Sequence, residues 1–241
     1  HPSLAVSAER QADSILDCPE GELPVSPGVF LMGSESNEAG RDEGPVHAVF
    51  VSGFCLDRLE VRTSDFASWL EGTTQASDLS NTAEWGQNDL PVETATWAQA
   101  SAFCAAQEKR LPTEAEWEKA ARGGCELGSD PLRCDPQDLR PYPWGGDAPS
   151  CELANHHLSM GQPRLCESGV KPVGSYLQGA GPYGHLDLAG NVWEWTSDPY
   201  HPEVYKRAPM RRDPSGPANG EIHVLSGGGW NTFSTNMRTA N

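Results

Sequence analysis

The sequence predicts a mixed strand-and-helix domain that is poor in regular secondary structure and is held together by loops and disulfide bridges. Three observations predict this. Short β-like runs broken by Pro and Gly follow Cys18, a self-capped helix begins at Thr113, and Gly and Pro recur every few residues from Gly123 to Tyr183. With 241 residues, the chain is long enough to bury the core of one large domain or two small ones.

The predicted strands come first along the chain. Residues 1–21 are polar and are expected to form an N-terminal leader or linker. The strand-like runs are Gly28–Gly33, Val46–Val51 and Phe54–Asp57. The middle run alternates imperfectly between apolar and polar residues, so one face is expected to be buried. His47 in that run is expected to face solvent.

Two amphipathic helices are predicted next. Thr63–Leu70 carries Phe66, Trp69 and Leu70 on one side, with Ser64 as its N-cap. Thr96–Lys109 has Ala100, Phe103, Cys104 and Gln107 along one stripe, which places the Cys104 thiol on the inner face.

The third predicted helix is specified by its own sequence. Thr113 as N-cap and Glu116 three residues later form a capping box, and Gly123-Gly124 ends the helix. Glu118 and Arg122 form a favourable pair at positions i and i+4. Because capping and pairing account for its acids, a hydrolase built on Glu114, Glu116 and Glu118 is not favoured.

Seven cysteines indicate an oxidising compartment. Cys125–Cys134 and Cys151–Cys166 each bracket a short loop and are interpreted as local disulfides, since their spacing does not suit zinc. Cys18–Cys55 is a reasonable third bridge, which leaves Cys104 over. We therefore expect a secreted, periplasmic or cell-surface protein.

The densest chemistry lies in Gly184–Trp195, after an expected strand at Val170–Tyr176 and before another at Ile222–Leu225. Its glycines permit sharp turns, and Asp187 and Glu194 supply hard oxygen ligands that suit Ca²⁺. The alternative is a turn fixed by tryptophans whose acids accept only backbone hydrogen bonds.

The net charge and hydropathy exclude two classes of partner. A formal charge of −17 disfavours nucleic acid, which requires clustered Lys and Arg. The sequence has no apolar run of membrane-spanning length, although a membrane-associated assembly stays open. The first residues lack a signal-peptide pattern, which fits a cytosolic protein or a secreted one whose leader has been removed.

Several segments together resemble the formylglycine-generating enzyme or sulfatase-modifying factor family. The two most specific are RLPTEAEWE from Arg110 and GNVWEW from Gly190. The other matching segments, all in the family's order, are Phe30–Gly33, Pro45–Val61, Tyr142–Gly145, Ala154–Asn155, Pro172–Ser175 and Gly227–Trp230.

The resemblance implies one α+β domain over residues 22–241, with the C-type-lectin-related fold of the formylglycine-generating enzymes. Such a domain has little regular secondary structure and depends on calcium and disulfides. The family continues past the position of Asn241 to a strand that contains a cysteine. The partner of Cys104 and part of the core are therefore expected there.

The resemblance also implies two calcium sites. Asp187, Gly190, Val192 and Glu194 would form the first, through side-chain and backbone oxygens. Asn155 and the carbonyl of His156 would contribute to the second. The segment that should complete the second site, 165–170, is shortened and contains Cys166 instead.

The match to the family's catalytic residues fails. These enzymes oxidise a sulfatase cysteine with copper and oxygen by means of two cysteines, whose positions correspond here to Thr232 and Met237. A hydroxyl and a thioether do not replace the thiolate pair that holds Cu(I). Arg238 matches an arginine that is common among non-catalytic relatives.

Two functional hypotheses follow. The favoured one is an extracytoplasmic, non-catalytic module that is stabilised by calcium and binds an unidentified protein or small molecule, or takes part in an assembly. Its groove would be lined by Trp230, Trp193, Tyr183, Thr232 and Arg238. The alternative is an oxidase with a histidine-based iron or copper centre, as in the iron-dependent sulfoxide synthases of this superfamily. The seven histidines show none of the spacings typical of such a centre.

Overall fold

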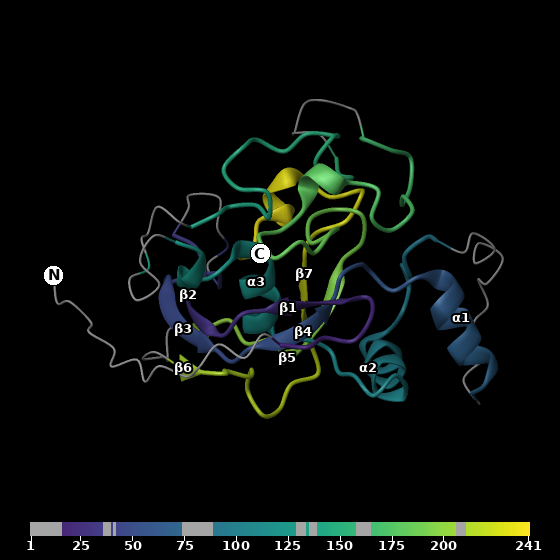
Figure 1. The fold of residues 1–241 in the computed structure, drawn as a ribbon, viewed down its shortest axis with the longest axis horizontal. Coiled ribbons are helices and arrows are strands. Elements are labelled where there is room, and N and C mark those ends of the chain that lie inside the picture. Colours follow the sequence, from purple (N-terminus) through teal and green to yellow (C-terminus); the bar gives the residue numbers. More distant parts are fainter. Residues whose placement is uncertain are drawn as a thin grey trace, which may run out of the picture.

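The computed structural model describes residues 16–35, 40, 42–73, 89–128, 134, 139–157, 165–205 and 211–241. Its regular elements are short, and they lie at the two ends and the centre of the molecule (Figure 1). Long loops from residues 140–157 and 165–190 gather on one side of the strands together with the C-terminal turn. This arrangement confirms a mixed α+β domain with little regular secondary structure.

The described residues form three small sheets. Strands β1 (Glu22–Val25) and β4 (Phe54–Asp57) pair antiparallel, as do β5 (Glu194–Pro199) and β7 (His223–Ser226). The third sheet has the order β2 (Gly28–Met32), β3 (His47–Val51) and β6 (Arg211–Arg212). The expected strands near residues 28, 47, 54 and 223 are confirmed.

Two predictions about strands were wrong. Residues 170–176 form turns and irregular structure, because Gly174 adopts a positive φ of 76° within a segment that contains Pro172. His47 does not simply face solvent. It is half-buried, and its ring packs 4.9 Å from that of Tyr205.

The described part of the chain contains the α-helices α1 (Thr63–Glu71), α2 (Trp97–Ala106) and α3 (Glu114–Arg122). Single 3₁₀ turns occur at Cys125–Leu127, Leu177–Gly179 and Ser234–Met237. The N-cap predicted for α1 was wrong, since Arg62 occupies that position without a side-chain cap. Helix α2 ends earlier than expected and begins with a capping box of Thr96 and Gln99.

Helix α3 lies at the centre of the molecule (Figure 1). The predicted capping box of Thr113 and Glu116 is confirmed. The predicted pair of Glu118 and Arg122 is also confirmed at 3.1 Å, but both side chains are buried. Glu118 accepts the Gly33 amide, and Arg122 donates to the Gly33 carbonyl, so the pair fastens α3 to the end of β2.

The core consists of several apolar clusters, two of which include residues of α3. One cluster contains Val25, Trp117, Ala120, Ala121 and Leu188, and a second joins β2 and β3 to Ala115. A third joins α1 to α2 through Phe66, Leu70 and Phe103. Because no large sheet organises them, loop residues such as Leu188 complete the core.

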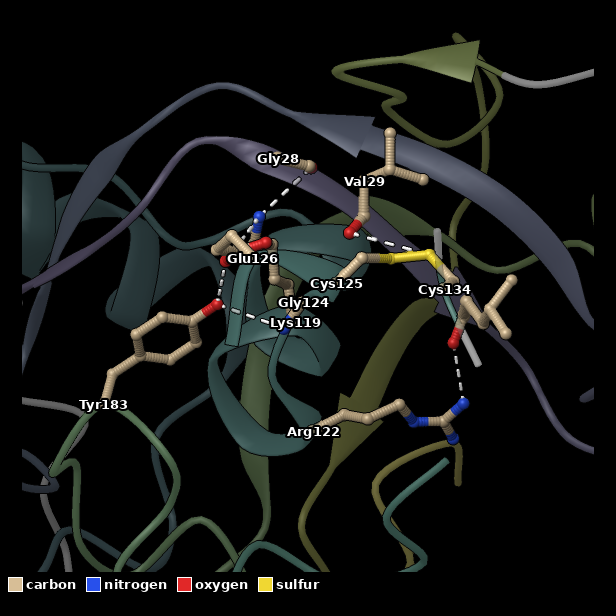
Figure 2. Close-up of a disulfide and its surroundings, with 10 residues drawn as sticks. Gly28, Val29, Lys119, Arg122, Gly124, Cys125, Glu126, Cys134 and Tyr183 are labelled. Carbon is tan, nitrogen blue, oxygen red and sulfur yellow. Dashed lines mark hydrogen bonds and ion pairs between the residues drawn. A yellow bond between two sulfur atoms is a disulfide. The ribbon is translucent and has the colours of Figure 1, made fainter. Parts of the chain in front are cut away.

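All three predicted disulfides are present: Cys18–Cys55, Cys125–Cys134 and Cys151–Cys166. Figure 2 shows Cys125–Cys134 beside the buried Lys119, whose ammonium contacts Glu126 at 3.2 Å. Cys104 has a free thiol and is half-buried. In the described part of the chain, no helix has the length and apolar character needed to cross a membrane.

Candidate metal centre

The turn 187–194 has an irregular backbone. Asp187, Gly190 and Asn191 have φ values of 62°, 78° and 60°, in the left-handed region. A Cβ on Gly190 would lie 2.3 Å from the carbonyl oxygen of Asn155, so only glycine fits there. The turn is fixed by bonds from the Gly190 amide to Gly227 and from the Asn191 amide to Asn155.

Two carbonyl groups of this turn belong to buried residues and have no donor among the described residues. Gly190 and Val192 are buried, yet no described residue donates a hydrogen bond to either carbonyl oxygen. Buried carbonyl oxygens are nearly always paired with a donor or bound to an ion or water. These two oxygens belong to the expected calcium ligands, and their chemistry fits a hard cation.

The two predicted acids of the turn are held by different neighbours. Asp187 accepts a 2.5 Å hydrogen bond from the Gly174 amide, and Glu194 accepts one at 3.0 Å from the indole of Trp117. Burial, followed by the charge of Asp187, raises the pKa of Glu194 to about 7. Burial also raises the pKa of Asp187.

A third acid, Glu60, belongs to the same neighbourhood and was not singled out from the sequence. Its carboxylate accepts hydrogen bonds from the Asn191 side chain at 2.8 Å and the Val192 amide at 3.2 Å. Burial, then the charges of Asp187 and Glu194, raise the pKa of Glu60 well above its usual range. Its position between the apolar Leu59 and Val61 was the only available signal.

No salt bridge within the described part of the chain involves Glu60, Asp187 or Glu194. No described protein cation therefore offsets the repulsion among these acids when they are ionised. The same part of the chain has no group of three His, Cys, Asp or Glu side chains arranged around one metal position. An ion bound at this turn would therefore have mixed oxygen ligands, namely backbone carbonyls and one or two carboxylates.

The residues of the expected second site lie beside this turn. Asn155 is fully buried, and its amide nitrogen donates to Gly169 at 2.9 Å and to Asn191 at 3.2 Å. Its side-chain oxygen, also buried, has no hydrogen-bond partner. An unpaired amide oxygen suits a hard cation. The His156 carbonyl, however, already accepts the Cys166 amide at 2.9 Å.

The His156 ring is buried as well. Its Nδ1 lies 2.9 Å from the carbonyl oxygen of His157, while Nε2 has no partner. Burial lowers the pKa of His156, which favours the neutral ring.

Thr232 and Met237 both have structural partners. The Thr232 hydroxyl donates to the Gly229 carbonyl and accepts its amide, each at 2.9 Å, and so closes the turn after the glycines. Met237 is fully buried against Ala154 and Ala189. Neither side chain is arranged as a ligand for a soft metal.

Three of the five predicted groove residues gather at Gly229. The Trp193 ring lies 3.3 Å from the position of a Cβ on that glycine. Trp230 follows Gly229 in the chain, and the Thr232 hydroxyl bonds to the Gly229 backbone. The Trp230 indole donates to Glu93 at 3.1 Å in an exposed hydrogen bond. We call Trp193, Trp230, Thr232 and Glu93 the indole surface.

The other two predicted groove residues are engaged elsewhere. Tyr183 donates its hydroxyl proton to Glu126 and accepts the Gly124 amide at 3.1 Å (Figure 2). Arg238 is 5% exposed and forms a two-pronged ion pair with Glu43, at 2.5 and 2.9 Å. Both side chains therefore fasten loops to the core, in place of the expected position in the groove.

Comparison with known proteins places these features in context. A family model described as "Sulfatase-modifying factor enzyme 1-like domain" matches residues 9–241. The chain is 34% identical over 235 residues to a serine/threonine-protein kinase pkn1 of Chlamydia caviae, covering 90% of this chain and 34% of the kinase. It thus spans about a third of that relative's length.

Two enzymes are also similar. A formylglycine-generating enzyme of Streptomyces coelicolor is 29% identical, over 95% of this chain and 84% of the enzyme. A hercynine oxygenase of Mycolicibacterium smegmatis is 37% identical over 150 residues, covering 59% of this chain and 31% of the oxygenase. Among solved structures, PvdO from Pseudomonas aeruginosa has the same fold, with a TM-score of 0.66 and 21% identity over 91% of this chain and 86% of PvdO.

Proposed function

Because this chain belongs to the family of sulfatase-modifying factor enzyme 1-like domains, we propose that it is a non-catalytic, calcium-stabilised binding or assembly module of that family. It acts outside the cytoplasm. The three disulfides support that location, since such bridges persist in oxidising compartments.

Calcium is the resident ion of the proposed module. Asp187 or Glu194 would supply carboxylate oxygen, and Gly190 and Val192 would supply their carbonyl oxygens. The unpaired carbonyls and the uncompensated acids support this assignment, because hard oxygen donors with net negative charge favour Ca²⁺. The bound ion neutralises the repulsion among the acids and so stabilises the loops around α3.

The lack of catalysis rests on one observation, which is the structural use of Thr232 and Met237. In the family resemblance these residues stand where copper-binding cysteines are expected. Here one closes a turn and the other fills the core. Without two thiolates the chain does not hold Cu(I) at this position.

The indole surface is the proposed contact region. Trp193 and Trp230 combine large apolar rings with a polar edge, as is common at protein interfaces. Glu93 adds a carboxylate that is already oriented by the Trp230 indole. A protein segment or small molecule with apolar and cationic groups fits this chemistry.

The alternative function is an oxidase with a histidine-held iron or copper centre. The similarity to a hercynine oxygenase favours it. The arrangement of side chains favours the module, because the described histidines do not join other ligands around one point.

An oxidation assay tests the proposed lack of catalysis. The protein is incubated with copper or iron, oxygen and a sulfatase-derived peptide that contains cysteine, and the peptide is followed by mass spectrometry. We expect the peptide cysteine to stay unmodified. We also expect Trp230→Ala to weaken the binding of any ligand that contacts the indole surface. Conversion of the peptide with turnover would overturn the proposed module.

A further inference from the structure

Glu60 lies in the segment between β4 and α1, and its side chain contacts the turn 187–194. One of its oxygens accepts the Val192 amide and the other accepts the Asn191 side chain. Val192 carries one of the unpaired carbonyls, and Asn191 lies between it and the other, on Gly190. Glu60 thus holds the peptide unit between Asn191 and Val192, and the two units that carry the unpaired carbonyls lie directly before and after it.

Asn191 connects Glu60 to Asn155, which belongs to the expected second calcium site. Its side-chain oxygen accepts the Asn155 amide at 3.2 Å and the Lys171 backbone amide at 2.9 Å. Its nitrogen donates to Glu60 and to the Lys171 carbonyl. The Asn155 nitrogen is thereby occupied on two sides, which fixes the side-chain oxygen that is buried without a partner.

We propose that Glu60 is the positioning residue of the metal centre: it fixes the Asn191–Val192 peptide between the two candidate carbonyl ligands and, through Asn191, the Asn155 side chain. This inference rests on the proposed calcium function. A bound cation would also favour the ionised form of the Glu60 carboxylate, whose charge would then add to the affinity.

The consequence is a link between the cation and the helical end of the molecule. Two residues after Glu60, Arg62 forms a bridge with Pro91, and Val92 donates to the Val61 carbonyl at 3.1 Å. Glu60 and Glu194 also border a largely apolar cavity of about 470 Å³, which is lined by Phe66 of α1 and Phe103 of α2. Cation binding is thus expected to order the segment that leads into α1.

The test compares calcium affinity by isothermal titration calorimetry in wild type, Glu60→Gln and Glu22→Gln. Glu22 is the matched control, since it borders the same cavity but binds Lys109 at 2.9 Å and does not touch the turn. We expect Glu60→Gln to bind Ca²⁺ about tenfold more weakly, and Glu22→Gln to match wild type.

Asn191→Gly provides a second test, because glycine accepts the φ of 60° without strain. It keeps the charge of Glu60 but removes the link to Asn155, and we expect weaker calcium binding here too. If Glu60 had only a structural role, Glu60→Gln would lower the unfolding midpoint in EDTA and leave the calcium affinity unchanged.

The outcomes are distinguishable. If wild type binds Ca²⁺ and both Glu60→Gln and Asn191→Gly bind it equally well, the role of Glu60 is overturned while the calcium function stands. If wild type itself binds no Ca²⁺ at millimolar concentration, both the calcium function and the role of Glu60 are overturned.

Discussion

Trp117 on α3 donates its indole N–H to the Glu194 carboxylate at 3.0 Å. This hydrogen bond joins the capped helix α3 to the turn 187–194, across 77 positions of the chain. Trp117 is 1% exposed, so its ring packs in the core while its polar edge orients a candidate ligand. The two most specific segments of the sequence therefore meet at one bond.

The first prediction concerns that bond. Trp117→Phe keeps an aromatic ring in the core but leaves Glu194 without its indole donor. We expect the free energy of unfolding in EDTA to fall by about 2 kcal/mol, which is typical for the loss of a hydrogen bond to a charged group. Urea unfolding measures this change. Trp144→Phe is the control, because its indole bond to Asp147 is exposed, and a comparable loss there would contradict the assignment.

Gly190 provides the second prediction. Gly190→Ala places a Cβ 2.3 Å from the Asn155 carbonyl oxygen and imposes a φ of 78° on an alanine. We expect destabilisation by about 2 kcal/mol or more, again by urea unfolding. Gly146→Ala is the matched control, since its Cβ would meet no atom within 4 Å. Equal stability of the two variants would show that the turn has another conformation.

The third prediction tests the buried ion pair of Arg238 and Glu43. Arg238→Ala leaves the 7% exposed Glu43 carboxylate without its cation, so we expect a loss of about 3 kcal/mol. Arg110→Ala removes an exposed partner of Glu116 and should cost less than about 1 kcal/mol. If Arg238→Ala is as mild as Arg110→Ala, the guanidinium is free for a ligand and our structural assignment is wrong.

The fourth prediction concerns pH. Burial raises the pKa of Glu114 from 4.5 to about 8, although the Tyr205 hydroxyl opposes this with a hydrogen bond. Between these values the folded protein holds a proton that the unfolded chain releases. Stability therefore falls as pH rises from about 4.5 to about 8.

Glu114→Gln removes this contribution and keeps an acceptor for Tyr205. In EDTA we expect a shallower decline of the unfolding free energy between pH 5 and pH 8, approximate limits chosen to bracket the shift. Glu118 and Glu194, each with a pKa near 7, keep part of the decline. An unchanged slope would mean that Glu114 is ionised in the folded protein throughout.

The sequence predicted features whose causes are local. The capping box of Thr113 and Glu116 depends on residues three positions apart, and it was confirmed. The pairs Cys125–Cys134 and Cys151–Cys166 were predicted from the short loops that they bracket, and both were confirmed. The predicted N-cap of α1 was wrong, because Arg62 occupies that position. The backbone there is held by a bridge between Arg62 and Pro91 and by the hydrogen bond from the Thr63 amide to Leu90.

Features that depend on contacts between distant segments were missed. Glu60 meets Asn191 across 131 positions, and no periodicity connects them. From the sequence, Tyr183 and Arg238 were expected to line the groove, because they lie near conspicuous motifs. Their hydrogen-bond partners, Glu126 and Glu43, lie 57 and 195 positions away in the chain. In a chain with so little regular structure, such contacts set the positions of loops, and one-dimensional patterns do not record them.

The most direct test of the whole account is the metal content of protein purified without chelators, measured by inductively coupled plasma mass spectrometry in wild type and Glu194→Gln. The account predicts stoichiometric calcium in wild type, its loss in Glu194→Gln, and no stoichiometric iron or copper in either. Wild-type protein without calcium, or with a full equivalent of iron or copper, would contradict it.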